Sequence, residues 1–295
     1  MPVPALPDEY QTFVQEADFW AALRRGELTY LDEWDDPSAE QSQRIADDVG
    51  GFRARARELQ LEAPLDARAL LATLEATAEL LELNRRILYQ SVAVNPEIGL
   101  LGNLVPFLPR QPLMSADDGS RYLVKLERFP DFAAAMAERL ASGVSAERTV
   151  LRRHAEATAD SLAAISENPA PFLQQPAPSE GFNEWESALA ERVHGPLVEG
   201  LVAYRDAIIE HSVLAGRADD EPGIMFWPDG EGLYEDLVRA NTNQDVTPDD
   251  VHRIGLERIE RLEDEYREIA GPIFGTTDIA EIFARQLLAD PPAVQ

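Results

Sequence analysis

Apolar positions recur with a helical period along almost the whole chain. Between residues 7 and 26 they fall near a 3.6-residue spacing, and Gly26 ends the run. Residues 64–94 carry the widest apolar face, as expected of a deeply buried helix, and Pro96 ends it. Further helices are predicted over residues 37–60, 119–128, 130–142, 145–167, 182–192, 196–216, 231–241, 247–266 and 277–289.

Four stretches interrupt this helical pattern. Gly50–Gly51 should break or loosen the helix that contains them, because glycine is a poor helix former. Residues 96–112 are apolar but repeatedly broken by proline, which predicts a connector. Residues 168–181 are rich in proline and polar side chains, which indicates a loop or linker. The apolar run 223–227 precedes the turn residues Pro228-Asp229-Gly230 and predicts one strand.

These elements predict an all-α fold, a multi-helix array with at most one or two short strands. The proline-rich stretch provides the best internal boundary. We therefore expect an amino-terminal helical region over residues 1–167, a linker or loop over 168–181, and a second helical region over 182–295. One continuous domain is the alternative.

Charge is the strongest compositional signal. The chain holds 54 acidic and 26 basic residues, a net charge of −28, and Lys125 is its single lysine. A phosphate backbone would be repelled, so we expect no nucleic-acid partner. The acidic excess predicts adaptation to high salt, with stability rising in molar potassium chloride as self-repulsion is screened. A GC-rich genome with an acidic surface is the alternative, but it explains the arginines better than the acids.

The chain contains no cysteine, which excludes disulfides and thiolate metal sites and favours a cytoplasmic location. The first ten residues show neither a basic patch nor an apolar run, so no signal peptide is predicted. The most apolar stretch, residues 98–108, is far shorter than the ~20 residues that a membrane helix needs. We therefore expect no membrane partner.

Residues 247–266 combine a clear helix start with one of the four histidines. Thr247 is placed to cap the helix, Pro248 suits its first position, and the acids at 249 and 250 meet the positive end of the helix dipole. His252 lies on the flank of the apolar face. The structural interpretation is a histidine packed at an interface, where it supports a helix junction.

A metal-binding interpretation rests on two acid–histidine pairs with i,i+3 spacing, Glu191 with His194 and Asp249 with His252. Helical bundles use such pairs in di-iron sites. However, His194 precedes Gly195-Pro196, which indicates a helix break, and acids are dense enough for chance pairs. The chain holds no H-E-x-x-H, G-x-S-x-G or Walker A motif. We therefore assign no catalytic residue and no metal ligand. The set Met225-Phe226-Trp227 before the Pro-Asp-Gly turn could line a cleft, although core packing is the simpler interpretation.

Read together, residues 222–270 resemble domain of unknown function family 885, whose members are relatives of zincin-like metallopeptidases. The resemblance rests on the Pro-Asp-Gly turn, on Tyr234, Leu237 and Thr242, and on Thr247-Pro248, His252, Gly255-Leu256 and Arg261. Residues 128–154 also look like the family's middle segment. Asn241-Thr242-Asn243 departs from the paired threonines that are common in the family.

The resemblance implies a helical protein that hydrolyses peptides with zinc, and a family length about twice that of this chain. It implies that the H-E-x-x-H helix lies beyond the matched region, so that this chain is the non-catalytic amino-terminal half and holds no cofactor itself. The implied partners are a carboxy-terminal half with the zinc motif and a peptide substrate. Candidate cleft residues are Gly232, Tyr234 and Arg239, because they follow the Pro-Asp-Gly turn. The rival hypotheses are a helical scaffold without an active site and a metalloprotein that uses the two acid–histidine pairs.

Overall fold

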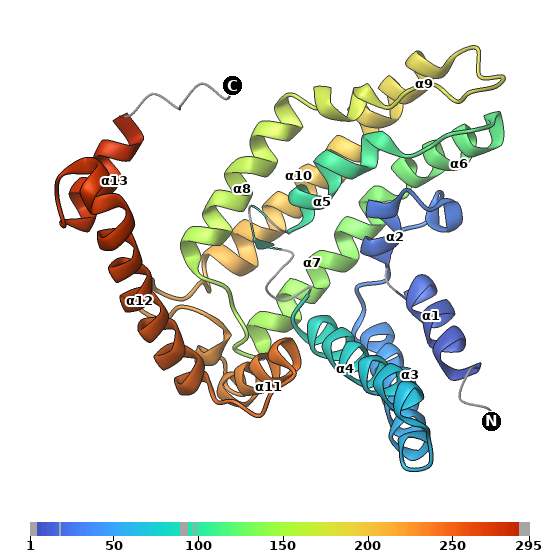
Figure 1. Ribbon diagram of the computed structural model, residues 1–295. Coiled ribbons are helices and arrows are strands. Elements are labelled where there is room, and N and C mark those ends of the chain that lie inside the picture. Colours follow the sequence, from blue (N-terminus) through green and yellow to red (C-terminus); the bar gives the residue numbers. More distant parts are fainter. Residues whose placement is uncertain (1–4, 18, 89–93, 96, 98, 289–295) are drawn as a thin grey trace. The chain divides into compact units, whose positions relative to one another are not determined.

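The computed structural model describes residues 5–17, 19–88, 94–95, 97 and 99–288. The chain divides into two compact units, residues 1–240 and residues 241–295 (Figure 1). Within the described ranges every regular element is helical, and β pairing is limited to a single parallel bridge between Leu151 and Arg217. The predicted all-α class is confirmed. No helix in these ranges is long and apolar enough to cross a membrane.

Helices account for most of the first unit. They are α1 (Ala5–Ala17), α2 (Phe19–Arg25), α3 (Ala39–Gln60), α4 (Leu65–Leu88), α5 (Leu100–Phe107), α6 (Ala116–Glu127), α7 (Phe129–Ser145), α8 (Arg152–Glu167), α9 (Trp185–Arg192), α10 (Val198–Ala207) and α11 (Gly230–Thr242), the last two residues of which fall in the second unit. Short 3-10 turns cover Leu28–Tyr30, Leu108–Arg110, Ala170–Gln174 and Ile224–Phe226, and π-helical turns cover Val193–Leu197 and Ile208–Val213.

Aromatic side chains form the centre of the first unit's main core. Trp34 stacks on Phe132 at 5.1 Å between ring centroids and meets Phe129 edge-on at 5.0 Å. Gly200 of α10 lies directly against Phe129, since a Cβ atom there would come within 2.5 Å of that ring. This close approach lets α10 pack on α7, and α8 packs on the other side of α10.

A second, smaller core joins α1, α3 and α4. Its buried members include Leu6, Ile45, Val49 and Leu71, and Tyr10 packs edge-on against Phe52. Helix α3 is unbroken, so the interruption predicted at Gly50–Gly51 is wrong. Both glycines face open space, and packing along the other side of the helix offsets their weak propensity.

Several predicted boundaries also change. The connector expected over residues 96–112 contains α5, because Leu100, Leu101 and Leu104 are buried and stabilise a helix that local propensity does not. Pro96, expected to end the preceding helix, lies outside the described residues. The helix expected from residue 145 begins at Arg152, since Glu147 has a positive φ and Leu151 pairs with Arg217. Residues 168–181 form a loop within the first unit, and the division between units follows Ala240.

The second unit contains α12 (Pro248–Phe274) and α13 (Ile279–Leu288). Thr247 caps α12 as predicted, and it does so in a reciprocal capping box with Asp250. Gly275 ends the helix in the left-handed conformation. The contact between the two helices includes Tyr266 and Phe283, whose ring centroids are 5.0 Å apart.

Candidate functional site

The Pro-Asp-Gly turn is a rigid junction rather than the end of a strand. Trp227 is buried and donates its indole N–H to the carbonyl of Thr149 at 2.8 Å. The Arg148 side chain donates to both carboxylate oxygens of Asp229, with Nε at 3.0 Å from Oδ1. Gly230 touches the Ile224 carbonyl so closely that no side chain fits. The predicted strand is therefore wrong, because these contacts bend residues 224–226 into a 3-10 turn.

The three predicted cleft residues all lie on α11, but they do not converge. Leu233 and Leu237 of this helix pack with Trp227 and Leu83. At about 100° per residue, Tyr234 lies on one flank of that buried stripe, and Gly232 and Arg239 lie on the other. All three are exposed, and Arg239 pairs with Asp236 of its own helix and with Glu79 of α4. Their role in substrate binding stays a prediction.

The two acid–histidine pairs lie in different units, and each pair is exposed. Glu191 pairs with Arg192, whereas His194 stands in a π-helical turn, and the helix is kinked there as expected because the backbone of Gly195 is non-helical. His252 is exposed on α12, so the packed position expected for it is wrong. Among the described residues, no three side chains of the metal-ligating kinds form a group that could hold a metal ion.

The lone lysine has an unusual environment that its sequence position did not reveal. Lys125 is 1% exposed, and its Nζ donates to the backbone carbonyls of Tyr30 at 2.6 Å and Glu33 at 2.8 Å. The rings of Phe19 and Trp34 lie 4.6 and 4.8 Å from the same atom. Burial lowers the pKa of Lys125 to about 7, although the charges of Asp32 and Glu33 oppose the shift. These contacts indicate a structural role: Lys125 joins α6 to the loop around residue 33.

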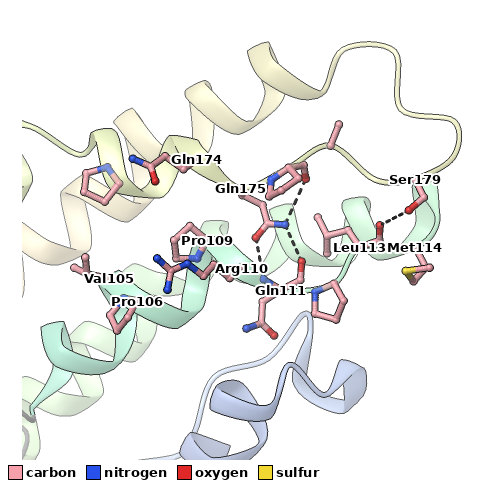
Figure 2. Close-up of a pocket in the computed structure, with 14 residues that line it drawn as sticks. Val105, Pro106, Pro109, Arg110, Gln111, Leu113, Met114, Gln174, Gln175 and Ser179 are labelled. Carbon is pink, nitrogen blue, oxygen red and sulfur yellow. Dashed lines mark hydrogen bonds between the residues drawn. The ribbon is translucent and has the colours of Figure 1, made fainter. Parts of the chain in front are cut away.

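A pocket of about 620 Å³ opens between residues 105–114 and residues 171–179 (Figure 2). Two buried glutamines join its walls. The Gln111 backbone N–H donates to Oε1 of Gln175 at 3.1 Å, and Nε2 of Gln175 donates to the Gln111 carbonyl at 2.8 Å. The two residues are 64 positions apart in the sequence, so helical periodicity gave no signal for this pocket. The recurrence of proline in both segments is the one feature that could have suggested it.

Helix α12 carries an apolar stripe that is uncovered except where Tyr266 touches Phe283 of α13. Apolar side chains recur at steps of three to five residues over most of its length, and each is at least one-third exposed: Val251, Ile254, Ile259, Leu262, Tyr266, Ile269 and Ile273. The buried residues of this helix are Ala270 and Gly271 at its end. A stripe this long is typical of a surface that meets another protein or segment.

Comparisons with known proteins agree with the helical fold. The chain is similar to the crystal structure of "the putative lipoprotein from Colwellia psychrerythraea", with a TM-score of 0.75 and 16% sequence identity. The match covers 97% of this chain and 54% of that protein, so the chain spans about half of its length. No curated protein matches the chain. The family described as "Bacterial protein of unknown function (DUF885)" matches residues 21–294. The chain therefore belongs to this family.

Proposed function

We propose that this chain is the amino-terminal, non-catalytic half of a zinc metallopeptidase-like protein and acts with a carboxy-terminal half that carries the zinc motif. The uncovered stripe of α12 is the observation that supports this proposal most directly. Exposed apolar area costs roughly 25 cal/mol per Å² relative to burial, so a partner that covers the stripe gains affinity. The structural neighbour extends well beyond the part that matches this chain, which is consistent with a second half.

The chemistry assigned to this half is substrate binding. Zinc hydrolysis needs three protein ligands and a base close to the bound water, and the described residues offer no such group. We assign no step of hydrolysis to this chain. Its contribution is a wall of the substrate cleft, with Gly232, Tyr234 and Arg239 of α11 as the candidate contacts to a peptide. A cytoplasmic location remains a prediction, and cell fractionation tests it.

Co-expression with a segment of a family member that carries H-E-x-x-H tests this proposal. We expect a soluble complex with about one zinc that cleaves short peptides. Ile259→Asp on the stripe should abolish the complex and leave the isolated chain's stability unchanged. Leu61→Asp, a control on an apolar residue of the first unit that is even more exposed than Ile259, should leave the complex intact. Tyr234→Ala should reduce hydrolysis more than assembly.

Two outcomes contradict the proposal. If the isolated chain is a soluble monomer that does not bind such a segment, the scaffold hypothesis is favoured. If Ile259→Asp unfolds the isolated chain, the stripe is covered within the chain itself and is no docking surface.

A further inference from the structure

The walls of the pocket in Figure 2 are rich in proline and poor in free hydrogen-bond donors. Prolines occupy five lining positions and have no backbone N–H: Pro106, Pro109, Pro112, Pro171 and Pro176. The buried side-chain amides of Gln111 and Gln175 are already engaged in hydrogen bonds within the protein. Gln111 Nε2 donates to the carbonyls of Leu23 and Phe107, and the Ser179 N–H donates to the Leu113 carbonyl. These polar groups position the walls and offer little to a ligand.

Two polar side chains remain available, one from each wall. Figure 2 shows Arg110 and Gln174 at the end of the pocket that Val105, Pro106 and Pro109 form. Both side chains are exposed, and neither makes a hydrogen bond or ion pair with the described part of the chain. Several arginines of the first unit are held by acids, as Arg85 is by Asp35 and Arg121 by Asp32. Arg110 therefore offers its full set of donors to a ligand.

The chemistry of these groups selects one class of ligand. A guanidinium presents parallel N–H donors that match the two oxygens of a carboxylate. The proline rings and Val105 favour an apolar body beside it, and about 620 Å³ lies within the roughly 300–1,000 Å³ typical of small-molecule sites. The chain's net charge of −28 disfavours polyanions such as polyphosphates.

We propose that this pocket binds a monocarboxylate with an apolar body, whose carboxylate pairs with Arg110 and whose body lies against the proline wall. The carboxylate can belong to a free organic acid or to the carboxy-terminus of a peptide. This site lies in the first unit and does not depend on the stripe of α12 or on the proposed function.

Titration calorimetry of the full chain with 3-phenylpropionate and its neutral amide tests the proposal. We expect saturable binding of the acid and about tenfold or greater weakening for the amide, as befits hydrogen bonds to a charged group. Arg110→Gln should weaken acid binding by a similar factor and leave amide binding unchanged. Arg152→Gln, an exposed arginine of α8 that carries the same charge change outside the pocket, should bind the acid as the wild type does.

A short alanine-rich peptide ending in phenylalanine, with either a free or an amidated carboxy-terminus, separates the two sources. If 3-phenylpropionate binds in an Arg110-dependent way and the peptide with a free carboxy-terminus does not bind, the site is assigned to small organic acids. If that peptide binds more tightly than 3-phenylpropionate, the site is assigned to peptide ends. The proposal is overturned if neither acid binds saturably, if acid and amide bind equally, or if Arg110→Gln binds the acid as tightly as Arg152→Gln does.

Discussion

Helices α10 and α12 are stabilised in opposite ways. In α10, Gly200, Leu201, Tyr204 and Ala207 are all buried, and the helix packs on α7 and α8. In α12 a capping box, a left-handed glycine at the end and ion pairs one turn apart support a helix that is exposed over most of its length. Such exposed ion pairs are screened by water and each contributes little, so α12 depends on the sum of several local interactions. The comparison teaches that the stability of α10 comes from packing against neighbouring helices, whereas the stability of α12 comes from interactions between residues close in the sequence.

Truncation of an aromatic ring in the core should give the largest difference in stability between the two regions. Phe129→Ala should reduce the free energy of unfolding of the first unit by about 3–5 kcal/mol, since it opens a cavity beside Trp34 and Phe132. Ile259→Ala on α12 should change stability by less than about 0.5 kcal/mol, because that side chain is 56% exposed. Urea unfolding followed by circular dichroism measures both. Equal effects would show that α12 is packed as tightly as the core.

The buried lysine should make the first unit's stability depend on pH. The pKa of Lys125 is lowered from 10.5 to about 7 on folding, so between these values the unfolded chain binds more protons. Stability from this group should therefore rise with pH, by about 1.4 kcal/mol per unit between pH 7 and 9. Below pH 7 the lysine is charged in the folded and the unfolded chain, so the full cost of burying its charge lowers the free energy of unfolding. Lys125→Met should lack this slope, and urea denaturation at several pH values compares the two proteins. Parallel curves would contradict the lowered pKa.

One substitution made in both helices should act with opposite signs. Gly200→Ala places a Cβ atom 2.5 Å from the Phe129 ring and 3.2 Å from the Pro130 Cα atom, so we expect a loss of about 1–3 kcal/mol. Gly255→Ala on α12 meets open space and should stabilise that helix by up to about 1 kcal/mol through its better propensity. Thermal unfolding and amide hydrogen exchange measure the two effects. A gain at both positions would mean that α7 and α10 can move apart.

Loss of a cap should have the smallest effect and remain local. Thr247→Ala removes the side chain that accepts from the Asp250 N–H at 3.1 Å, so α12 should lose about 1 kcal/mol. Hydrogen exchange should quicken in the first turns of α12 and stay unchanged in α10. Thr247→Ser, which retains the hydroxyl, serves as the control. Faster exchange in α10 as well would show that the two helices unfold together.

Much of the fold follows from local chemistry that the sequence displays. The start of α12 depends on Thr247, Pro248 and Asp250, which lie within four residues of one another, so the prediction needed no distant contact. The same holds for most helices of the first unit, whose apolar period determines which face is buried. Helix α5 was missed because its stability comes from burial of Leu100, Leu101 and Leu104 and not from its proline-broken sequence.

The sites depend on residues that are far apart in the chain. Lys125 meets the Tyr30 carbonyl across 95 residues, and Gln111 meets Gln175 across 64. The turn at Gly230 depends on Thr149 and Arg148, which hold Trp227 and Asp229 from a distant segment. By itself the sequence determined the helical class, the charge and the cap of α12, because these depend on composition and neighbouring residues. Only the tertiary structure decided the lysine's environment, the proline-lined pocket and the uncovered face of α12, because those depend on which distant surfaces meet.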